Sequence, residues 1–156
     1  MTSDAPATIR SLQATDQAAW HTLWLGYQGF YAVDIPEETT SFTLRRLLDP
    51  AEPMHGAVAI DAAGVAVGLV HLVRHRSTWT AADYCYLQDL YVAAEARGAG
   101  IGSALLEHSY LWAEAHGCAR VHWLTHESNA AAQSLYLRSA ERSGFIQFRK
   151  LLPPRS

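Results

Sequence analysis

A strand that leads through a glycine-rich turn into a helix is the feature that most limits how this chain can fold. Residues 84–92 (YCYLQDLYV) read as a strand, residues 97–102 read RGAGIG, and residues 100–117 repeat apolar side chains at helical spacing. In such a turn, several main-chain N–H groups point to one place, where the helix N-terminus adds positive partial charge. Glycine permits positive φ and lets a phosphate approach the backbone. The turn predicts a pyrophosphate site, and a turn without a ligand is the alternative.

Other phosphate-binding loops do not fit this spacing. A P-loop requires a lysine followed by serine or threonine after its glycines, and no such pair follows the glycines here. A dinucleotide fingerprint that starts at Gly98 requires a further glycine where Ser103 stands. The turn therefore differs from both of the common nucleotide-binding types.

Periodicity and turn residues predict the rest of the elements. The strands expected are 7–12, 55–61, 65–75, 84–92, 120–126 and 145–152, and the later helices are 100–117, ended by Gly117, and 129–144. Three consecutive strands followed by alternating helices and strands predict an α/β fold, with a mixed, mostly antiparallel central sheet and helices on both faces. We expect a single domain over residues 1–156, structured over about 7–152.

Two helices are expected between the first and second strands. One starts at Thr15 and carries Trp20, Leu23, Trp24 and Tyr27 at three- and four-residue spacing. For the second helix, Asp34 and Glu37 resemble a capping box, and Pro36 suits the first turn. That helix is expected to end at Asp49, before Pro50.

Composition excludes several classes of function. The formal charge of −3 argues against a nucleic-acid surface. The two cysteines, Cys85 and Cys118, fit neither a disulfide framework nor a metal motif. The first residues lack the pattern of a signal peptide, and no apolar run approaches the ~18–20 residues of a membrane span. We therefore expect a cytoplasmic protein that binds neither nucleic acid nor membrane.

Segments 87–92, 97–102 and 126–136 together resemble the signature of the GNAT (GCN5-related N-acetyltransferase) superfamily, in its histone- and polyamine-acetyltransferase branch. The resemblance implies acetyl-coenzyme A as co-substrate. The pyrophosphate would lie on the glycine-rich turn, and the pantetheine would pair with the end of the preceding strand. The cofactor-binding residues implied are Leu90, Tyr91, Val92, Arg97, Gly98, Ala99, Gly100, Ile101, Gly102, Ser103, Asn129, Ala132 and Tyr136.

The resemblance also implies direct attack by a primary amine on the thioester, within a ternary complex. Tyr136 would protonate the departing thiolate. Polyamine-type relatives carry a glutamate base where this chain has Gln88, which cannot accept a proton. His126 and Glu127, or a water chain, are the candidates for proton handling. We interpret Asp89 as a hydrogen-bonded structural carboxylate.

The acceptor side is expected near the first two helices and the loop after residue 75. Tyr31, Asp34, Trp79 and Gln88 are the predicted substrate-binding residues, because aromatic rings with carboxylates suit a cation. The acceptor could be a polyamine, an amino acid or a lysine-containing peptide. We expect no metal, since the histidines lack a metal-binding spacing, and we expect a homodimer. Two alternatives remain open: a non-catalytic acyl-coenzyme A sensor, and an oligomerising structural domain.

Overall fold

The computed structural model describes residues 7–155, and their contacts divide the chain after Leu124 into two compact units. The first unit contains the sheet and three helices, α1 (Gln17–Tyr31), α2 (Glu37–Leu48) and α3 (Ile101–Ala115). The second unit, which begins at Thr125, contains the short helix α4 (Ala130–Tyr136).

Five strands of the first unit form one sheet in the order β1-β2-β3-β4-β5. Neighbours are antiparallel from β1 to β4, whereas β5 runs parallel to β4. The change of direction follows from α3, which carries the chain back along the sheet between β4 and β5. The strands are β1 (Thr8–Ser11), β2 (Met54–Ile60), β3 (Ala66–His75), β4 (Asp83–Val92) and β5 (Cys118–His122).

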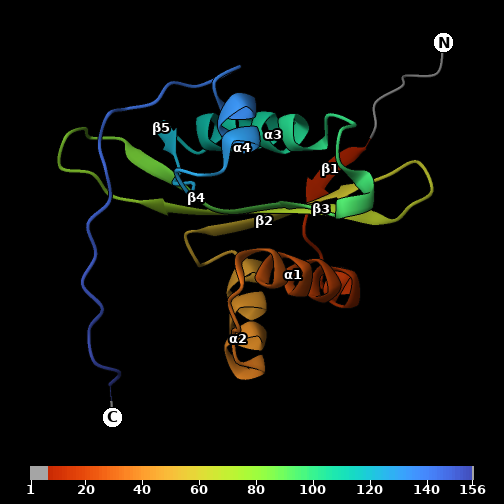
Figure 1. The fold of residues 1–156 in the computed structure, drawn as a ribbon. Coiled ribbons are helices and arrows are strands. Elements are labelled where there is room, and N and C mark those ends of the chain that lie inside the picture. Colours follow the sequence, from red (N-terminus) through yellow and green to blue (C-terminus); the bar gives the residue numbers. More distant parts are fainter. Residues whose placement is uncertain (1–6, 156) are drawn as a thin grey trace. The chain divides into compact units, whose positions relative to one another are not determined.

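Helices cover both faces of this sheet. Figure 1 shows α1 (Gln17–Tyr31) and α2 (Glu37–Leu48) on one face and α3 (Ile101–Ala115) on the other. Every residue of β3 from Val67 to Leu72 is buried, as expected for a central strand covered on both sides. Short 3-10 turns precede α1 (Ala14–Asp16) and follow β4 (Ala94–Ala96). The predicted α/β fold, with a mixed, mostly antiparallel sheet, is confirmed.

The core between the sheet and the first two helices is built from large apolar side chains. On α1, Trp20, Leu23 and Trp24 are spaced so that they share one face and pack toward Val58 and Leu69 of the sheet. On the opposite face, a side chain at Gly68 would lie 3.2 Å from Leu105 Cδ1 and 3.4 Å from Ile101 Cγ2. Glycine at this position therefore lets α3 approach β3 closely.

Three local predictions were wrong. Helix α2 begins at Glu37 with Pro36 at its N-cap and no side-chain cap, so Asp34 forms no capping box among the described residues. Helix α4 ends at Tyr136, well before Gly144, and residues 145–152 form no strand. Alternating apolar residues supply the faces of a strand, but the hydrogen-bond ladder that defines one is absent from this segment. By contrast, α3 ends as predicted, with Gly117 at φ 72°.

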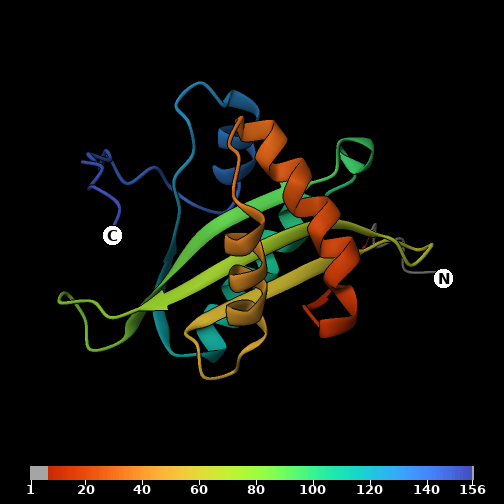
Figure 2. The same ribbon diagram turned by 90° about the horizontal axis from the view of Figure 1, so that it is seen from below.

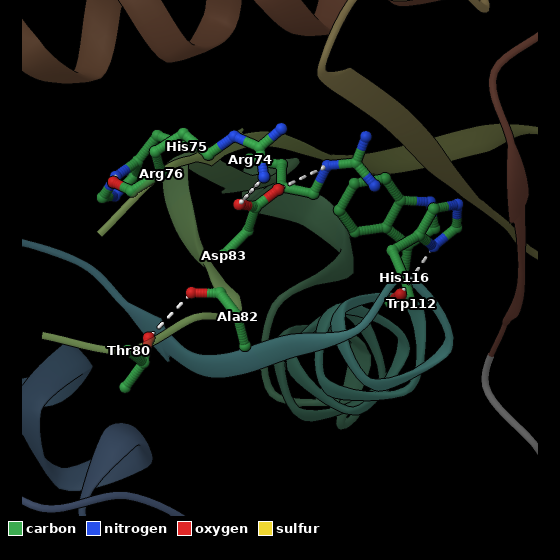
Figure 3. Close-up of polar contacts among 8 residues, drawn as sticks. All are labelled: Arg74, His75, Arg76, Thr80, Ala82, Asp83, Trp112 and His116. Carbon is green, nitrogen blue, oxygen red and sulfur yellow. Dashed lines mark hydrogen bonds and ion pairs between the residues drawn. The ribbon is translucent and has the colours of Figure 1, made fainter. Parts of the chain in front are cut away.

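The end of the β3–β4 hairpin is held by surface ion pairs. Figure 3 shows the Asp83 carboxylate beside two guanidinium groups, 3.4 Å from Arg74 Nε and 3.3 Å from Arg76 Nη1. In the adjoining loop, the Thr80 hydroxyl donates to Ala82 O at 2.7 Å. The arginine residues thus balance the charge of Asp83 at the start of β4, and these ion pairs have a structural role.

Two imidazoles meet where α3 packs beside β2. His55 Nε2 lies 3.0 Å from His108 Nε2, so only one of these nitrogens can carry a proton in the contact. The His55 ring also stacks on Trp112 at a centroid distance of 4.9 Å. Burial, followed by the neighbouring His108 and His116, lowers the pKa of His55 to about 4.

The depressed pKa predicts a pH-dependent stability. The unfolded chain binds a proton on His55 near pH ~6.5, and the folded chain does so only near pH 4. The free energy of unfolding should therefore fall as the pH drops through this window, by about 1–2 kcal/mol after allowance for partial exposure of the ring. Urea melts at several pH values across the window should show that the free energy of unfolding depends less steeply on pH in His55→Phe. This variant keeps an aromatic ring against Trp112. His21→Gln, at the surface of α1, is the control, and an undiminished slope in His55→Phe contradicts the assignment.

Candidate active site

An open strand edge lies beside the predicted cofactor turn. Strand β4 pairs with β3 from Tyr84, opposite His75, to Val92, opposite Gly68. On its other edge, β4 pairs with β5 only from Asp83 to Tyr86. Within the described first unit, the main chain from Leu87 to Val92 is therefore available on that edge for an extended ligand. Leu90, Tyr91 and Val92, predicted to contact the pantetheine, all lie on this stretch.

A β-bulge at Gln88 changes which faces of the sheet the neighbouring side chains occupy. His71 lies opposite Asp89 and Leu72 lies opposite Leu87, which leaves Gln88 as the extra residue of β4. Opposed residues share a face, so Leu87 lies on the α3 face with Leu72, and Asp89 lies on the α1 face with His71. Without the bulge, Leu87 and Asp89 would share a face. The bulge thus directs a carboxylate into the layer between the sheet and α1.

Asp89 is the last member of a chain of hydrogen bonds that runs from Trp20 through His71. The indole N–H of Trp20 donates to His71 Nε2 at 2.9 Å, and His71 Nδ1 lies 2.9 Å from Asp89 Oδ2. Because Nε2 accepts, the proton of the neutral ring is on Nδ1, which donates to the carboxylate. All three residues are nine-tenths buried or more. The interpretation of Asp89 as a hydrogen-bonded carboxylate is confirmed, whereas its partners His71 and Trp20 were not predicted.

Three tyrosine side chains lie in the electrostatic neighbourhood of Asp89. We call Tyr27 and Tyr31 of α1 together with Tyr86 of β4 the tyrosine cluster; the Tyr27 and Tyr31 rings lie 4.7 Å apart. Burial, and next the charge of Asp89, raises the pKa of each of these phenols above its usual range, most for Tyr27. The cluster therefore consists of phenols that stay neutral over the usual pH range.

The glycine-rich turn has the shape that its sequence predicted. Gly98 and Gly100 take φ of 83° and 80°, and a side chain at either position would point into open space. Helix α3 starts at Ile101, and Ala104 N donates to Gly100 O at 3.1 Å. The N–H groups earlier in this first turn have no carbonyl one turn before them, so they can bind an anion.

The Arg97 side chain connects the glycine-rich turn to α1 and β4. Its Nε donates to Val92 O at 3.0 Å, and its guanidinium lies 5.2 Å from the centroid of Phe30 and 5.7 Å from that of Tyr91. These contacts tie the end of β4 to the C-terminal part of α1. The remaining cofactor residues predicted in this unit, Ala99, Gly102 and Ser103, lie in the turn or in the first turn of α3.

The second unit carries the other predicted cofactor and catalytic residues. Asn129 Oδ1 accepts from Ala132 N at 3.3 Å and so caps α4, whose last residue is Tyr136. His126 Nδ1 lies 2.6 Å from Ser128 Oγ, and the main-chain O of Glu127 accepts from a glutamine side chain at 2.8 Å. The side chains of Glu127 and His126 are exposed, as a group that exchanges protons requires.

The predicted acceptor residues do not form one group. Tyr31 belongs to the tyrosine cluster, and Asp34 is exposed in the loop after α1. Gln88 is exposed at the bulge. Trp79 is 73% exposed in the β3–β4 loop, which Figure 2 shows at the opposite end of the hairpin from the turn that follows β4. The structure thus places Trp79 far from Tyr31 along the sheet.

The described part of the chain contains neither a cluster of metal ligands nor a helix that could span a membrane. Among residues 7–155, no three side chains of His, Cys, Asp or Glu converge as metal ligands would. No described helix has the length and apolar character that crossing a bilayer requires.

Comparisons with known proteins agree with this geometry. Residues 16–140 match the model of the acetyltransferase (GNAT) family, and the chain therefore belongs to that family. It is an acetyl-coenzyme A-dependent N-acetyltransferase.

Two relatives act on different amines. The chain is 34% identical to the D-amino-acid N-acetyltransferase HPA3 of Saccharomyces cerevisiae, over 91% of this chain and 89% of the relative. It is 27% identical to the aminoglycoside N(6')-acetyltransferase type 1 of Klebsiella aerogenes, over 86% and 88%. Among solved structures, AAC(6')-Iy in complex with a bisubstrate analog of coenzyme A superposes with a TM-score of 0.81, at 18% identity, over 94% of this chain and 99% of that one.

The Trp20–His71 bond predicts a measurable loss of stability. Trp20→Phe leaves His71 Nε2 buried without its donor and removes part of a large core side chain, so we expect a loss of about 2–4 kcal/mol in the free energy of unfolding. Guanidinium melts would measure it. Trp79→Phe, at an exposed position, is the matched control and should change stability by less than about 0.5 kcal/mol. Equal stability of the two variants would show that the Trp20–His71 bond contributes little.

Proposed function

We propose that this acetyltransferase acts on the primary amine of a small, amino-acid-like acceptor, by direct attack on acetyl-coenzyme A in a ternary complex. The observation that carries the proposal is the open edge of β4 between Leu87 and Val92, which leads into the positive-φ turn at the start of α3. The similarity to a D-amino-acid acetyltransferase over most of both chains supports the choice of acceptor. A polyamine, an aminoglycoside and a lysine-containing peptide are the other acceptors to be tested.

Different segments of the chain would bind the pantetheine and the pyrophosphate of the cofactor. The pantetheine would run along Leu90, Tyr91 and Val92 as an added strand, where main-chain groups recognise its amides. The pyrophosphate would accept hydrogen bonds from N–H groups between Gly98 and Ser103. From the second unit, Asn129, Ala132 and Tyr136 are the proposed contacts. We propose that both units form one acetyltransferase domain, which assembles as a homodimer.

The transfer needs a neutral amine, an oxyanion donor and a proton for the thiolate. An alkylammonium with a pKa near ~10.4 must first lose a proton, which His126, Glu127 or a water chain would accept. The main-chain N–H of Leu90 would stabilise the oxyanion that forms as the nitrogen bonds to the carbonyl carbon. The C–S bond then breaks, and the Tyr136 hydroxyl would give its proton to the leaving sulfur.

Gln88 supports a second candidate function. An exposed amide at the bulge offers no base where polyamine-type relatives carry a glutamate, which would suit a module that binds acyl-coenzyme A without turnover. The two candidates differ in a single observable, the release of thiol that depends on added amine.

Release of coenzyme A thiol should therefore depend on the amine. We expect D-amino acids to give the highest kcat/KM in a panel that also contains L-amino acids, polyamines, aminoglycosides and lysine peptides. Reactions without amine are the control for hydrolysis. Binding of acetyl-coenzyme A without release for any amine would favour the sensor, and a preference for another amine would correct the acceptor class.

Tyr136→Phe separates chemistry from binding. Loss of the hydroxyl should lower kcat by about 10²-fold, as expected for removal of a general acid, and leave the Kd of acetyl-coenzyme A within about twofold. Stopped assays and calorimetry would measure the two quantities. Tyr110→Phe on α3 is the control, with kcat expected near that of the wild type. Parallel losses of binding and rate would identify Tyr136 as a structural residue.

A further inference from the structure

The direction of the peptide groups at the end of β4 determines what the open edge offers to a ligand. Ala93 N donates to Val67 O of β3 at 2.8 Å, so this N–H points toward β3. In a trans peptide the preceding C=O points the opposite way, so Val92 O points away from β3. Residues two apart on a strand point the same way, and Leu90 therefore shares this direction. The open edge thus presents the N–H and C=O groups of Leu90 and Val92.

The Arg97 side chain occupies the last acceptor on this edge. Its Nε donates to Val92 O at 3.0 Å, while the guanidinium lies 5.2 Å from the Phe30 ring centroid and 5.7 Å from that of Tyr91. Aromatic faces attract guanidinium groups, so the two rings favour this position of the side chain. An amide N–H of a ligand that runs along the edge has to compete with Arg97 for the same carbonyl oxygen.

The Arg97 guanidinium carries a positive charge that no carboxylate among residues 7–155 pairs. The ion pairs that arginine residues form there involve Arg10, Arg74 and Arg76. Arg97 directly precedes Gly98, the first positive-φ residue of the turn that is proposed to bind the pyrophosphate. A guanidinium bonds more strongly to a phosphate oxygen than to a neutral carbonyl, because both partners are charged. A diphosphate at the turn would therefore compete with Val92 O for this side chain.

We propose that Arg97 makes the enzyme select coenzyme A thioesters over thioesters that lack the diphosphate. While Arg97 is bonded to Val92 O, the end of the open edge is closed to an amide of the pantetheine. A thioester with a diphosphate gives the displaced guanidinium an anionic partner, whereas an acyl-pantetheine gives it none. Arg97 is thus a specificity-determining residue. The inference rests on the proposed function, because it uses the cofactor site assigned there.

Binding of coenzyme A and of pantetheine, which lacks the phosphates, tests the inference without turnover. Each ligand would be titrated into the protein while ¹H–¹⁵N NMR follows the Val92 amide and the Arg97 Nε–H. In Arg97→Met, we expect the Kd of pantetheine to fall at least about threefold and the Kd of coenzyme A to rise at least about threefold. Arg46→Met is the matched control, because the Arg46 guanidinium also lies over an aromatic ring, that of Phe42, at 4.0 Å on α2. Both of its Kd values should match those of the wild type.

Opposite changes for the two ligands distinguish selection from a structural role, since loss of a structural contact would weaken the binding of both. A Kd of pantetheine that does not fall in Arg97→Met would overturn the inference, as would an unchanged Kd of coenzyme A. An Arg97 Nε–H signal that stays unchanged at saturation with coenzyme A would overturn it too.

A second variant keeps the guanidinium and changes only its surroundings. Phe30→Leu removes a ring that favours the position of Arg97 on Val92 O, so the Kd of each ligand should fall by about twofold. If Arg97→Met does not fold, this variant decides, and a rise in either Kd would overturn the inference. Normal selection between the two ligands in a protein that releases no thiol with any amine would instead contradict the proposed function.

Discussion

The extra residue at Gln88 determines how β4 is shared between the two faces of the sheet. On one side of the bulge, Leu87 faces α3, and on the other side Asp89 faces α1. This reversal brings a carboxylate within 2.9 Å of His71, which in turn accepts a hydrogen bond from the indole N–H of Trp20 in the core. A bulge also bends and twists the strand locally, and β4 stops pairing with β5 after Tyr86, just before the bulge. The polar network and the open strand edge are thus neighbours on one strand.

The two ends of β4 have different surroundings. At its start, Asp83 is neutralised by arginine residues and contributes to the end of the hairpin. At its end, Val92 accepts from Arg97, and the chain enters the glycine-rich turn. Between them, the buried Asp89 carboxylate is held by a hydrogen bond from His71.

Local patterns in the sequence predicted most of the first unit. The β2–β3 hairpin, β4 and α3 follow from alternation, helical spacing and glycine at Gly117, which are properties of short segments. The bulge could not be predicted, because register depends on the partner strand. On α3, Ser109 is fully buried whereas Leu111 is 58% exposed, the reverse of what their polarity indicates. The Ser109 hydroxyl donates a hydrogen bond to Leu105 O, which offsets the free-energy cost of burying it. The bond between Trp20 and His71 could not be predicted either, because nothing in the sequence places these two side chains together. The segment 145–152 has the alternation of a strand, but alternation alone provides no neighbouring strand.

The most direct test of the account is a map of the main-chain amides that respond to coenzyme A. In ¹H–¹⁵N NMR titrations, the account predicts the largest shifts at Leu90–Val92 and Gly98–Ser103, and little change at the start of β4. Gly100→Val, which forces a branched residue to φ near 80°, should remove these shifts while the remaining spectrum stays folded. Shifts confined to other segments, or an unchanged affinity in Gly100→Val, would contradict the assignment of the turn and of the open edge of β4 as the coenzyme A site.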